Sequence, residues 1–327
     1  MAYSRIGLAA LAAATALGLA ACSGAPATPS PSAPAAQTTV TVTDNNGDHT
    51  ISVPPTSVVA LDNRTFQTLY DWNVKLSAAP RALIPSTIGY ATDESIPDIG
   101  THGDPKLELI VAAEPDLIIN GQRLTSQFDK IAADNPDAVQ LLLDPRKGEP
   151  FDAELKRQIT VLGKAFGKDA EAAALTQKFD ESIKAVKGAY KTDDTVMAVI
   201  VSGGKIGYVA PTTGRTLGPL FDIFGFTPSL KQEGSEDHQG DDISVETIAA
   251  SNPDWLLVMD RDAAIAAGEP DYKQASTVIE QSEALKNVPA VTKGQVVYMP
   301  ADTYTNEGIQ TYTTFFTELA TAMAAAK

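Results

Sequence analysis

The hydrophobic pattern of the chain contains two unbroken apolar runs, each placed directly after a Pro-Asp pair. The first run covers residues 117–119 and follows residues 115–116, and the second covers residues 255–258 and follows residues 253–254. Continuous apolar runs of this length are typical of strands in a parallel sheet that is covered on both faces. The pattern therefore predicts an α/β fold in which helices cover the sheet strands.

Both runs belong to a longer repeated unit. The segments ELIVAAEPDLIINGQR (108–123) and ETIAASNPDWLLVMDR (246–261) share a first Glu, a central Pro-Asp and a last Arg. Each segment predicts a short helix, a turn and a strand that runs back along the helix, so the first Glu and the last Arg lie at one end of the sheet. Ligands bind at this carboxyl edge of open α/β sheets. The repeat predicts two equivalent lobes with Arg123 and Arg261 at their ligand-binding edges, and Arg64, which follows another apolar strand, is a further candidate.

The remaining pattern alternates strands and helices on either side of a long helical stretch. It predicts a hairpin at 39–53, strands at 57–61, 195–202, 205–210 and 295–299, and helices at 64–72, 216–225 and 307–325. The stretch at 151–191 consists of helix formers, with Gly163 and Gly167 as its weakest points. We therefore predict two Rossmann-like lobes, residues 38–150 and 192–327, which are joined by a single long helix at 151–191 and enclose a ligand cleft.

The N-terminal residues have the pattern of a secretory signal. Arg5 is followed by a small-apolar run that ends at Cys22, the only cysteine of the chain. The run is short for a helix that spans a membrane, and no basic flank follows it. Leu-Ala-Ala-Cys resembles a bacterial lipobox, which implies that residues 1–21 are a signal peptide and that the sulfur of Cys22 is diacylated. An uncleaved anchor, or an ordinary signal with a chance cysteine, is the alternative interpretation.

The Pro/Ser/Ala tract at 22–37 cannot bury a core and predicts a flexible stalk. The folded part is then tethered to the extracytoplasmic face of the cell membrane.

The chain has 41 acidic and 25 basic residues, which give a net charge of -16. This charge argues against nucleic acid or anionic lipid as a partner. Only eight residues are arginine, so the positions of the arginines are informative.

Five sequence blocks, in order, resemble one protein family. The first-half block is DIGTHGDPKLELIVAAEPDLIINGQR, and the second-half blocks are GRTLGPLFDIFGF, EDHQGDDISVE, NPDWLLVMDRDAAI and VVYMPADTYTNEG. They are similar to the substrate-binding lipoproteins of ABC importers that carry siderophores, haem and cobalamin, and most similar to the ferric catecholate and petrobactin-type siderophore-binding proteins. The resemblance implies a monomeric receptor, not an enzyme, that has no intrinsic cofactor. Such a receptor binds an Fe(III)-siderophore and delivers it to permease subunits that a separate ATPase drives.

The resemblance also implies roles for individual residues. Arg123, Arg215 and Arg261 fall where the family places arginines that face the anionic oxygens of the ligand. A ferric tris-catecholate is a trianion whose iron is already six-coordinate, so a receptor must supply positive charge and planar donors, and arginine supplies both. His238 and Tyr304 fall where some members complete the coordination of the iron when the siderophore is tetradentate.

The resemblance also covers two acidic residues, and the chain differs from the family pattern at three places. Glu108 and Glu246 fall where one acidic residue on each lobe pairs with arginines of the permease. The glycine-rich run after the tyrosine is reduced to residues 305–308, Thr216 replaces an aromatic residue, and one extra residue precedes Arg123. The identity of the siderophore stays open.

Three other functions remain as alternatives. A haem or cobalamin receptor has the same fold, and Tyr304 could then serve as an axial haem ligand. A receptor for bare Zn or Mn needs several histidine and carboxylate ligands, and the chain has only three histidines. For an extracellular enzyme, the sequence lacks a Gly-x-Ser-x-Gly elbow, a His-Glu-x-x-His motif and a phosphate-binding loop.

Overall fold

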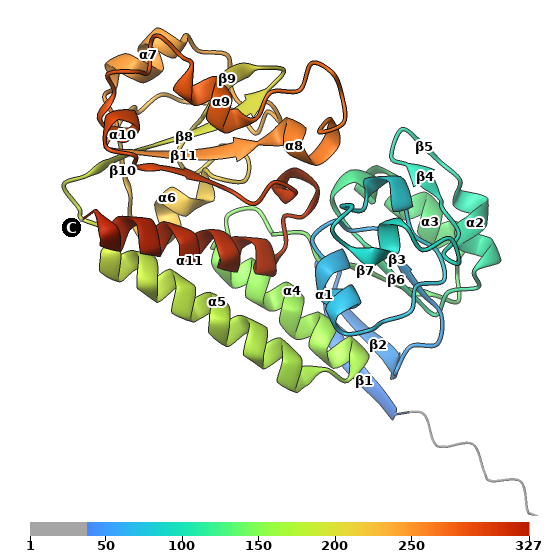
Figure 1. Ribbon diagram of the computed structural model, residues 1–327. Helices are drawn as coiled ribbons and strands as arrows, with labels where there is room; N and C mark the ends of the chain where they lie inside the picture. Colours follow the sequence, from blue (N-terminus) through green and yellow to red (C-terminus); the bar gives the residue numbers. More distant parts are fainter. Residues whose placement is uncertain (1–37, 327) are drawn as a thin grey trace, which may run out of the picture. The chain divides into compact units, whose positions relative to one another are not determined.

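Two sheets, one in each half of the chain, form the frame of the fold (Figure 1). The structure is a computed structural model that describes residues 38–326. The predicted signal peptide, Cys22 and the predicted stalk lie outside the described residues. None of the helices in the described range is long and apolar enough to cross a membrane.

The first lobe is built on a three-stranded parallel sheet with the strand order β3-β6-β7. A hairpin (β1-β2) and a two-stranded antiparallel pair (β4-β5) accompany this sheet. The elements of the first lobe are β1 (Thr38–Thr43), β2 (Asp48–Val53), β3 (Val58–Ala60), α1 (Phe66–Asp71), η1 (Arg81–Leu83), η2 (Gly89–Ala91), β4 (Gly100–Thr101), β5 (Asp104–Pro105), α2 (Leu107–Ala112), β6 (Leu117–Asn120), η3 (Gln122–Gln127), α3 (Phe128–Asp134) and β7 (Val139–Leu142), where η denotes a 3-10 helix.

The second lobe is built on a five-stranded sheet with the order β10-β8-β11-β12, in which β9 pairs antiparallel with β8 and the other pairs are parallel. Its elements are β8 (Thr195–Ser202), β9 (Lys205–Val209), α6 (Pro219–Phe224), β10 (Thr227–Pro228), α7 (Val245–Ala250), β11 (Trp255–Asp260), α8 (Arg261–Ile265), α9 (Ala275–Glu280), α10 (Pro289–Thr292), β12 (Val296–Tyr298), η4 (Thr303–Thr305) and α11 (Ile309–Ala325). Two α/β lobes with central parallel strands confirm the predicted fold class.

The Pro-Asp pair has the same structural role in both copies of the repeat. Asp116 accepts hydrogen bonds from the backbone of Thr56 (2.7 Å) and Ser57 (3.0 Å), just before β3. Asp254 accepts the equivalent bond from the backbone of Thr195 (3.0 Å), the first residue of β8. Each aspartate therefore fixes the register of its strand against the neighbouring strand, which explains why the repeat contains an aspartate at this position.

One hydrophobic core continues from the first lobe to the second. Successive strand residues point to opposite faces of a sheet. In β8 the residues of one face contribute to this shared core, together with one face of β3 and β6 and residues of α4, α5 and α11 (bounds of α4 and α5 below). The other faces of the two sheets pack into separate smaller clusters. Both sheets are therefore covered on both faces, as the apolar runs predict.

The connection between the lobes differs from the prediction of a single long helix. It consists of two helices, α4 (Phe151–Phe166) and α5 (Asp169–Ala189). Gly167 ends α4 in the left-handed conformation, with φ 64° and ψ 34°. Figure 1 shows α5 turning back beside α4 and lying along α11. Gly167 lets the chain reverse because glycine adopts this conformation without the steric cost of a Cβ.

Candidate functional site

The repeat places Arg123 and Arg261 at equivalent positions beyond the carboxyl ends of two strands. Arg123 lies in η3, which follows β6, and Arg261 is the first residue of α8, which follows β11. A Cβ on Gly121 would lie 2.6 Å from the carboxylate of Asp62, so a larger residue there would clash with this buried side chain. The Asp260 side chain caps α8 by accepting a bond from the Ala263 backbone (3.0 Å). Both guanidinium groups therefore start from well-defined backbone positions.

Three arginines surround the ring of Tyr304. The guanidinium carbons of Arg123, Arg215 and Arg261 lie 4.9, 4.8 and 4.8 Å from the ring centroid, within the range of cation–π contacts. Tyr304 lies in η4 after β12 and is 5% exposed. The structure therefore brings together four residues that the sequence analysis selected, from segments far apart in the chain.

Arg123 and Arg261 keep donor capacity free for a ligand. Arg123 Nη2 donates to the backbone oxygen of Tyr304 (3.2 Å), and Arg261 Nη1 donates to Ser202 Oγ (3.2 Å) and Asp262 Oδ1 (3.3 Å). In the described part of the chain, the buried Nε atoms of Arg123 and Arg261 have no hydrogen-bond partner. Buried donors are nearly always satisfied, so an anionic ligand oxygen is a natural partner for them.

The arginines also change the acidity of Tyr304. Burial acts to raise the pKa of its hydroxyl, but Arg261, Arg215 and Arg123 outweigh this effect and hold the pKa below its ordinary value. A phenol with a lowered pKa gives up its proton more easily to a metal ion or a nearby base. Tyr304 is thus chemically suited to contact an Fe(III) centre.

Arg215 has a carboxylate partner that the sequence analysis missed. Its Nε and Nη2 donate to the two carboxylate oxygens of Glu307 at 3.3 and 3.1 Å. Glu307 also accepts bonds from Gln122 Nε2 (2.9 Å) and from the hydroxyl of Thr216, and Arg64 Nη2 lies 3.9 Å from its Oε2. The chain differs from the family pattern at or beside Glu307, Gln122 and Thr216. These differences were the only sign in the sequence that could have pointed to this network. The expected excess of positive charge is therefore partly neutralised.

Arg64 lies beside this network and has a second carboxylate partner. Arg64 Nη1 donates to Asp144 Oδ1 at 3.2 Å. Asp62 accepts a hydrogen bond from the backbone of Arg64 (2.9 Å). Burial raises the pKa of Asp62 to about 7, although the charge of Arg64 acts to lower it. Arg64 thus joins the site as a paired cation, whereas the sequence analysis selected it for its position alone.

Two adjoining cavities form the cleft. The tyrosine cavity, about 580 Å³, is lined by Arg123, Arg215, Arg261, His238 and Tyr304, together with apolar residues. The glutamate cavity, about 530 Å³, shares Arg123 and Arg215 and adds others. The residues that line only the glutamate cavity include Arg64, Gln122, Asp144, Glu236 and Glu307. All six predicted ligand-binding residues therefore line this cleft.

The histidines are placed differently from one another. His238 is exposed in the loop before α7, and it lines the tyrosine cavity. His102 is also exposed and lines the same cavity from the first lobe. Within residues 38–326, no group of three or more His, Cys, Asp or Glu side chains is arranged to hold a metal ion.

Glu108 and Glu246 have matching places on the two lobes. Each lies in the first turn of the helix that opens its copy of the repeat, α2 or α7, and each is exposed. Neither glutamate has an ion-pair partner within the described part of the chain. Both carboxylates are therefore available to a partner protein.

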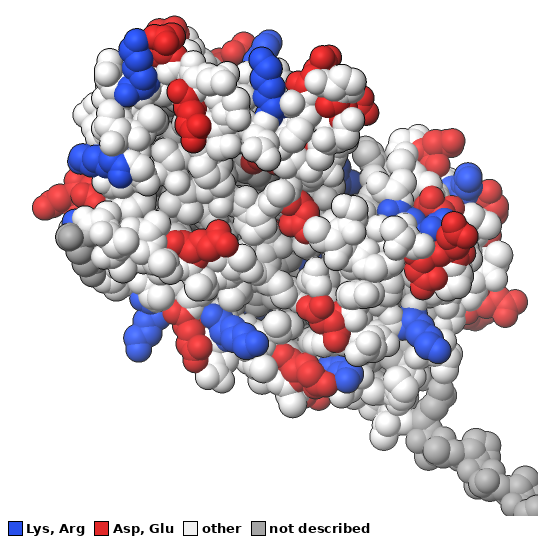
Figure 2. Space-filling model, viewed as in Figure 1, with Lys and Arg blue, Asp and Glu red and all other residues white. Residues whose placement is uncertain are grey.

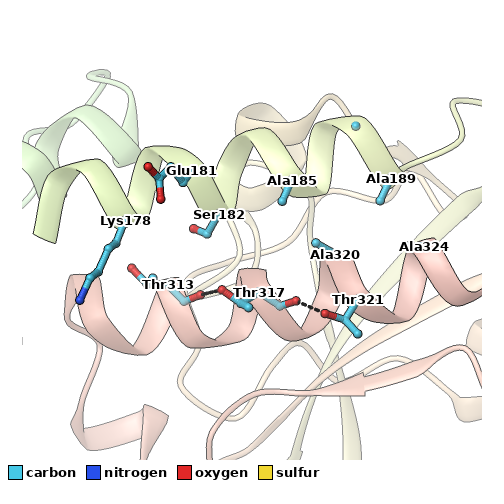
Figure 3. Close-up of a pocket in the computed structure, with 11 residues that line it drawn as sticks. Lys178, Glu181, Ser182, Ala185, Ala189, Thr313, Thr317, Ala320, Thr321 and Ala324 are labelled. Carbon is cyan, nitrogen blue, oxygen red and sulfur yellow. Dashed lines mark hydrogen bonds between the residues drawn. The ribbon is translucent and has the colours of Figure 1, made fainter. Parts of the chain in front are cut away.

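A further hollow of about 690 Å³ lies between α5 and α11 (Figure 3). Its walls consist mostly of small side chains, and Figure 3 shows Thr317 and Thr321 bonded to the backbone of their own helix. Figure 2 shows acidic and basic side chains interspersed over the visible face. The arginine side chains around Tyr304 distinguish the cleft from the α5–α11 hollow, whose charged lining residues are Lys178 and Glu181.

The chain matches one protein family over most of its length. The model of the periplasmic binding protein family matches residues 58–303, which is most of the chain. The chain belongs to the periplasmic binding protein family. This family membership confirms the prediction of a binding protein rather than an enzyme.

Two characterised periplasmic binding proteins are similar in sequence. The petrobactin-binding protein YclQ of Bacillus subtilis is 27% identical over 264 residues, which are 80% of this chain and 79% of YclQ. The ferric-anguibactin-binding protein FatB of Vibrio anguillarum is 26% identical over 273 residues, 82% of each chain. The predicted resemblance to siderophore-binding proteins is therefore confirmed, because both relatives are named for binding siderophores.

Solved structures of periplasmic binding proteins share the fold. The structure of YclQ superposes with a TM-score of 0.74 at 24% identity, covering 88% of this chain and 99% of that one. The catecholate-siderophore-binding protein VctP of Vibrio cholerae superposes with a TM-score of 0.73 at 21% identity, covering 88% of this chain and 100% of that one. These structures confirm the two-lobed architecture.

Proposed function

We propose that this protein is an extracytoplasmic receptor that binds a catecholate-bearing Fe(III)-siderophore and delivers it to an ABC permease. The observation that carries the proposal is the convergence of three guanidinium groups on Tyr304 in the cleft. YclQ and FatB are named for binding petrobactin and ferric anguibactin. Iron is here the cargo, and the protein itself needs no cofactor.

The chemistry of the tyrosine cavity suits a ferric catecholate. Arg123 and Arg261 line this cavity, so their guanidinium groups can donate hydrogen bonds to phenolate oxygens. Each charge-assisted hydrogen bond contributes roughly 1.5–3 kcal/mol. The flat catechol rings can pack on the apolar wall of the cavity, which consists of Ala82, Leu83, Ile84, Ala264 and Ile265. A few such bonds and this apolar contact together reach the order of the ~12 kcal/mol of a nanomolar complex.

His238 and Tyr304 are our proposed iron ligands for a tetradentate siderophore, which leaves two coordination positions open. Both residues line the tyrosine cavity, and Tyr304 has a lowered pKa, which favours a phenolate. A Tyr304→Phe variant then loses the phenolate-to-iron charge-transfer band of the bound tetradentate complex. An unchanged visible spectrum would remove Tyr304 from the iron.

Delivery requires that the receptor stay close to the permease. We propose that Cys22 carries a lipid, that residues 22–37 act as the stalk, and that Glu108 and Glu246 contact the permease. Tethering raises the effective concentration of the receptor at the membrane. Mass spectrometry of the mature protein tests the anchor, because a chain without a diacylglyceryl group on its first cysteine rules it out.

Fluorescence titration tests the ligand class directly. Trp72 and Trp255 are both buried and provide the intrinsic signal. A ferric catecholate is expected to quench this fluorescence with submicromolar affinity, whereas hemin and cyanocobalamin are expected to have little effect. Saturable quenching by hemin alone would support the haem-receptor alternative instead.

A further inference from the structure

A buried carboxylate lies within the cleft that is expected to receive an anion. Glu307 is 3% exposed, and both of its oxygens accept hydrogen bonds. Its donors come from both lobes: Gln122 from the first lobe, and Arg215 and Thr216 from the second. A buried acidic side chain with this many donors is held in one position and cannot turn away from a ligand.

Glu307 is ionised at neutral pH. Burial acts to raise the pKa of its carboxyl, but Arg215, Arg64 and the Thr216 hydroxyl outweigh burial and lower the pKa. Its negative charge is therefore a fixed feature of the empty cleft. Because the surroundings are shielded from water, this charge acts on a bound ligand with little screening.

Carboxylates offset most of the arginine charge in the cleft. Four arginines (Arg64, Arg123, Arg215 and Arg261) and two carboxylates that pair with them (Asp144 and Glu307) line the two cavities, and the exposed Glu236 lines the glutamate cavity without an ion pair among the described residues. Arg64 pairs with Asp144, Arg215 with Glu307 and Arg261 with Asp262, which lies just outside the lining. Within the described residues, only Arg123 of these arginines has no carboxylate within ion-pair distance. The fixed charges of the cleft leave a small positive excess.

We propose that Glu307 is a specificity-determining residue that selects a ferric siderophore complex with a low negative charge, near that of a monoanion, over a ferric tris-catecholate trianion. This inference rests on the proposed function, because it specifies the ligand of the same cleft. A ferric bis-catecholate is such a monoanion, since two dianionic catecholates surround a trivalent iron.

The hydrogen-bond geometry explains the selection. Two donors of the Arg215 fork are already committed to Glu307, so Arg215 offers mainly its flat face and its remaining donors to a ligand. A trianion that filled the glutamate cavity would bring phenolate oxygens close to an ionised carboxylate. Like charges in a partly buried site repel strongly. A monoanion confined to Arg123 and Arg261 in the tyrosine cavity avoids this repulsion.

The test compares two probes on the wild-type protein and on Glu307→Gln. The probes are a hexadentate ferric tris-catecholate and a tetradentate ferric bis-catecholate, each titrated by tryptophan fluorescence. The wild-type protein is expected to prefer the monoanion. Glu307→Gln removes the charge but keeps the shape, so it strengthens binding of the trianion by at least about tenfold and changes binding of the monoanion by less than about threefold.

Glu236→Gln is the matched control. Glu236 lines the same cavity, but it is exposed to solvent and has no ion pair among the described residues. The same change of side chain there alters binding of the trianion by less than about twofold, because water screens the charge. A second variant, Glu307→Asp, keeps the charge and therefore keeps the discrimination between the probes.

The possible outcomes separate this inference from the proposed function. If neither ferric probe binds the wild-type protein, the proposed function fails. If both probes bind but Glu307→Gln alters their affinities equally, Glu307 only holds the lobes together and the inference fails. Equal effects of Glu307→Gln and Glu236→Gln would also overturn it. Melting temperature and binding of the monoanion show whether Glu307→Gln is folded.

Discussion

At the scale of single residues, the cleft contains arginines of two kinds. Arg64 and Arg215 are held by carboxylates inside the cleft. Arg123 and Arg261 line the tyrosine cavity and contact Tyr304, and each keeps a buried Nε without a partner in the described part of the chain, as Arg64 also does. An unsatisfied buried donor costs free energy in the empty protein, and a ligand that satisfies it removes that cost. Because carboxylates of the cleft already hold the first kind, we expect the second kind to contribute most to binding.

Replacing Arg123 or Arg261 by glutamine tests this difference. Each substitution removes a charged donor from the tyrosine cavity, so we expect the dissociation constant for a ferric catecholate to rise more than tenfold, on the order of the ~1.5–3 kcal/mol of one charge-assisted bond. Fluorescence titration measures the change. Arg81→Gln is the control, because Arg81 is an arginine of the first lobe that lines neither cavity. Unchanged affinity in both cleft variants would contradict the binding role of the arginine pair.

Arg123, Arg261 and Glu307 differ in how well the sequence alone can assign them to the site. Arg123 and Arg261 could be placed because a repeat fixes equivalent positions at strand ends. Glu307 could not be placed, because its role depends on Gln122 and Thr216, which are distant in sequence and reach it only in the folded chain. A single acidic residue in a polar loop is indistinguishable, in one sequence, from a solvated one.

At the scale of secondary structure, the strands followed the sequence closely and the connector did not. The strand predicted at 195–202 is β8 with the same bounds, because its apolar run is buried on both faces. The predicted single helix failed at Gly167. Helix propensity alone cannot tell whether a glycine is tolerated inside a helix or ends it, since that choice depends on where α5 packs. Here α5 packs on α11, where the rings of Phe179 and Phe316 stack with their centroids 5.6 Å apart.

Two glycine-to-alanine substitutions test the importance of the turn between α4 and α5. Gly167 has φ 64°, so alanine there is expected to lower the free energy of unfolding by about 1–2 kcal/mol. Gly188 lies in α5, and a Cβ added there would meet no atom within 4 Å, so alanine at this position is expected to raise the free energy of unfolding by up to about 1 kcal/mol. Urea unfolding measures both changes. Destabilisation by both variants, or by neither, would contradict the role assigned to Gly167.

At the scale of the whole molecule, residues around η4 and the start of α11 join the lobes on the side of the cleft. Asn63 donates to the backbone oxygen of Thr305 (2.9 Å), and Gln310 donates to Thr68 (2.9 Å). Glu307 and Tyr304 lie in the same short segment as these contacts. A ligand bound at Tyr304 therefore contacts the segment that holds the two lobes together, and this links occupancy of the cleft to the arrangement of the lobes.

A receptor must present both lobes to its permease, and Glu108 and Glu246 are the residues with which we propose it does so. Substituting either glutamate by lysine reverses the charge at one contact, and like charges facing each other across an interface cost several kcal/mol. Uptake of the radiolabelled iron complex by cells is therefore expected to fall at least about tenfold for each variant. Affinity for the ferric complex is expected to stay within about twofold, because both side chains lie outside the cleft.

The control for these variants is Glu94→Lys, which reverses the charge of another exposed glutamate of the first lobe that has no ion pair among the described residues. It should leave uptake unchanged. If Glu108→Lys lowered uptake while Glu246→Lys did not, only the first lobe would dock through its glutamate. The two copies of the repeat would then be equivalent in the cleft but not in docking. If all three variants lowered uptake equally, the net charge of the receptor would explain the effect and docking through these two positions would be wrong. A loss specific to both glutamates instead requires that the permease contact the two helix N-termini at once, because each copy of the repeat contributes one carboxylate.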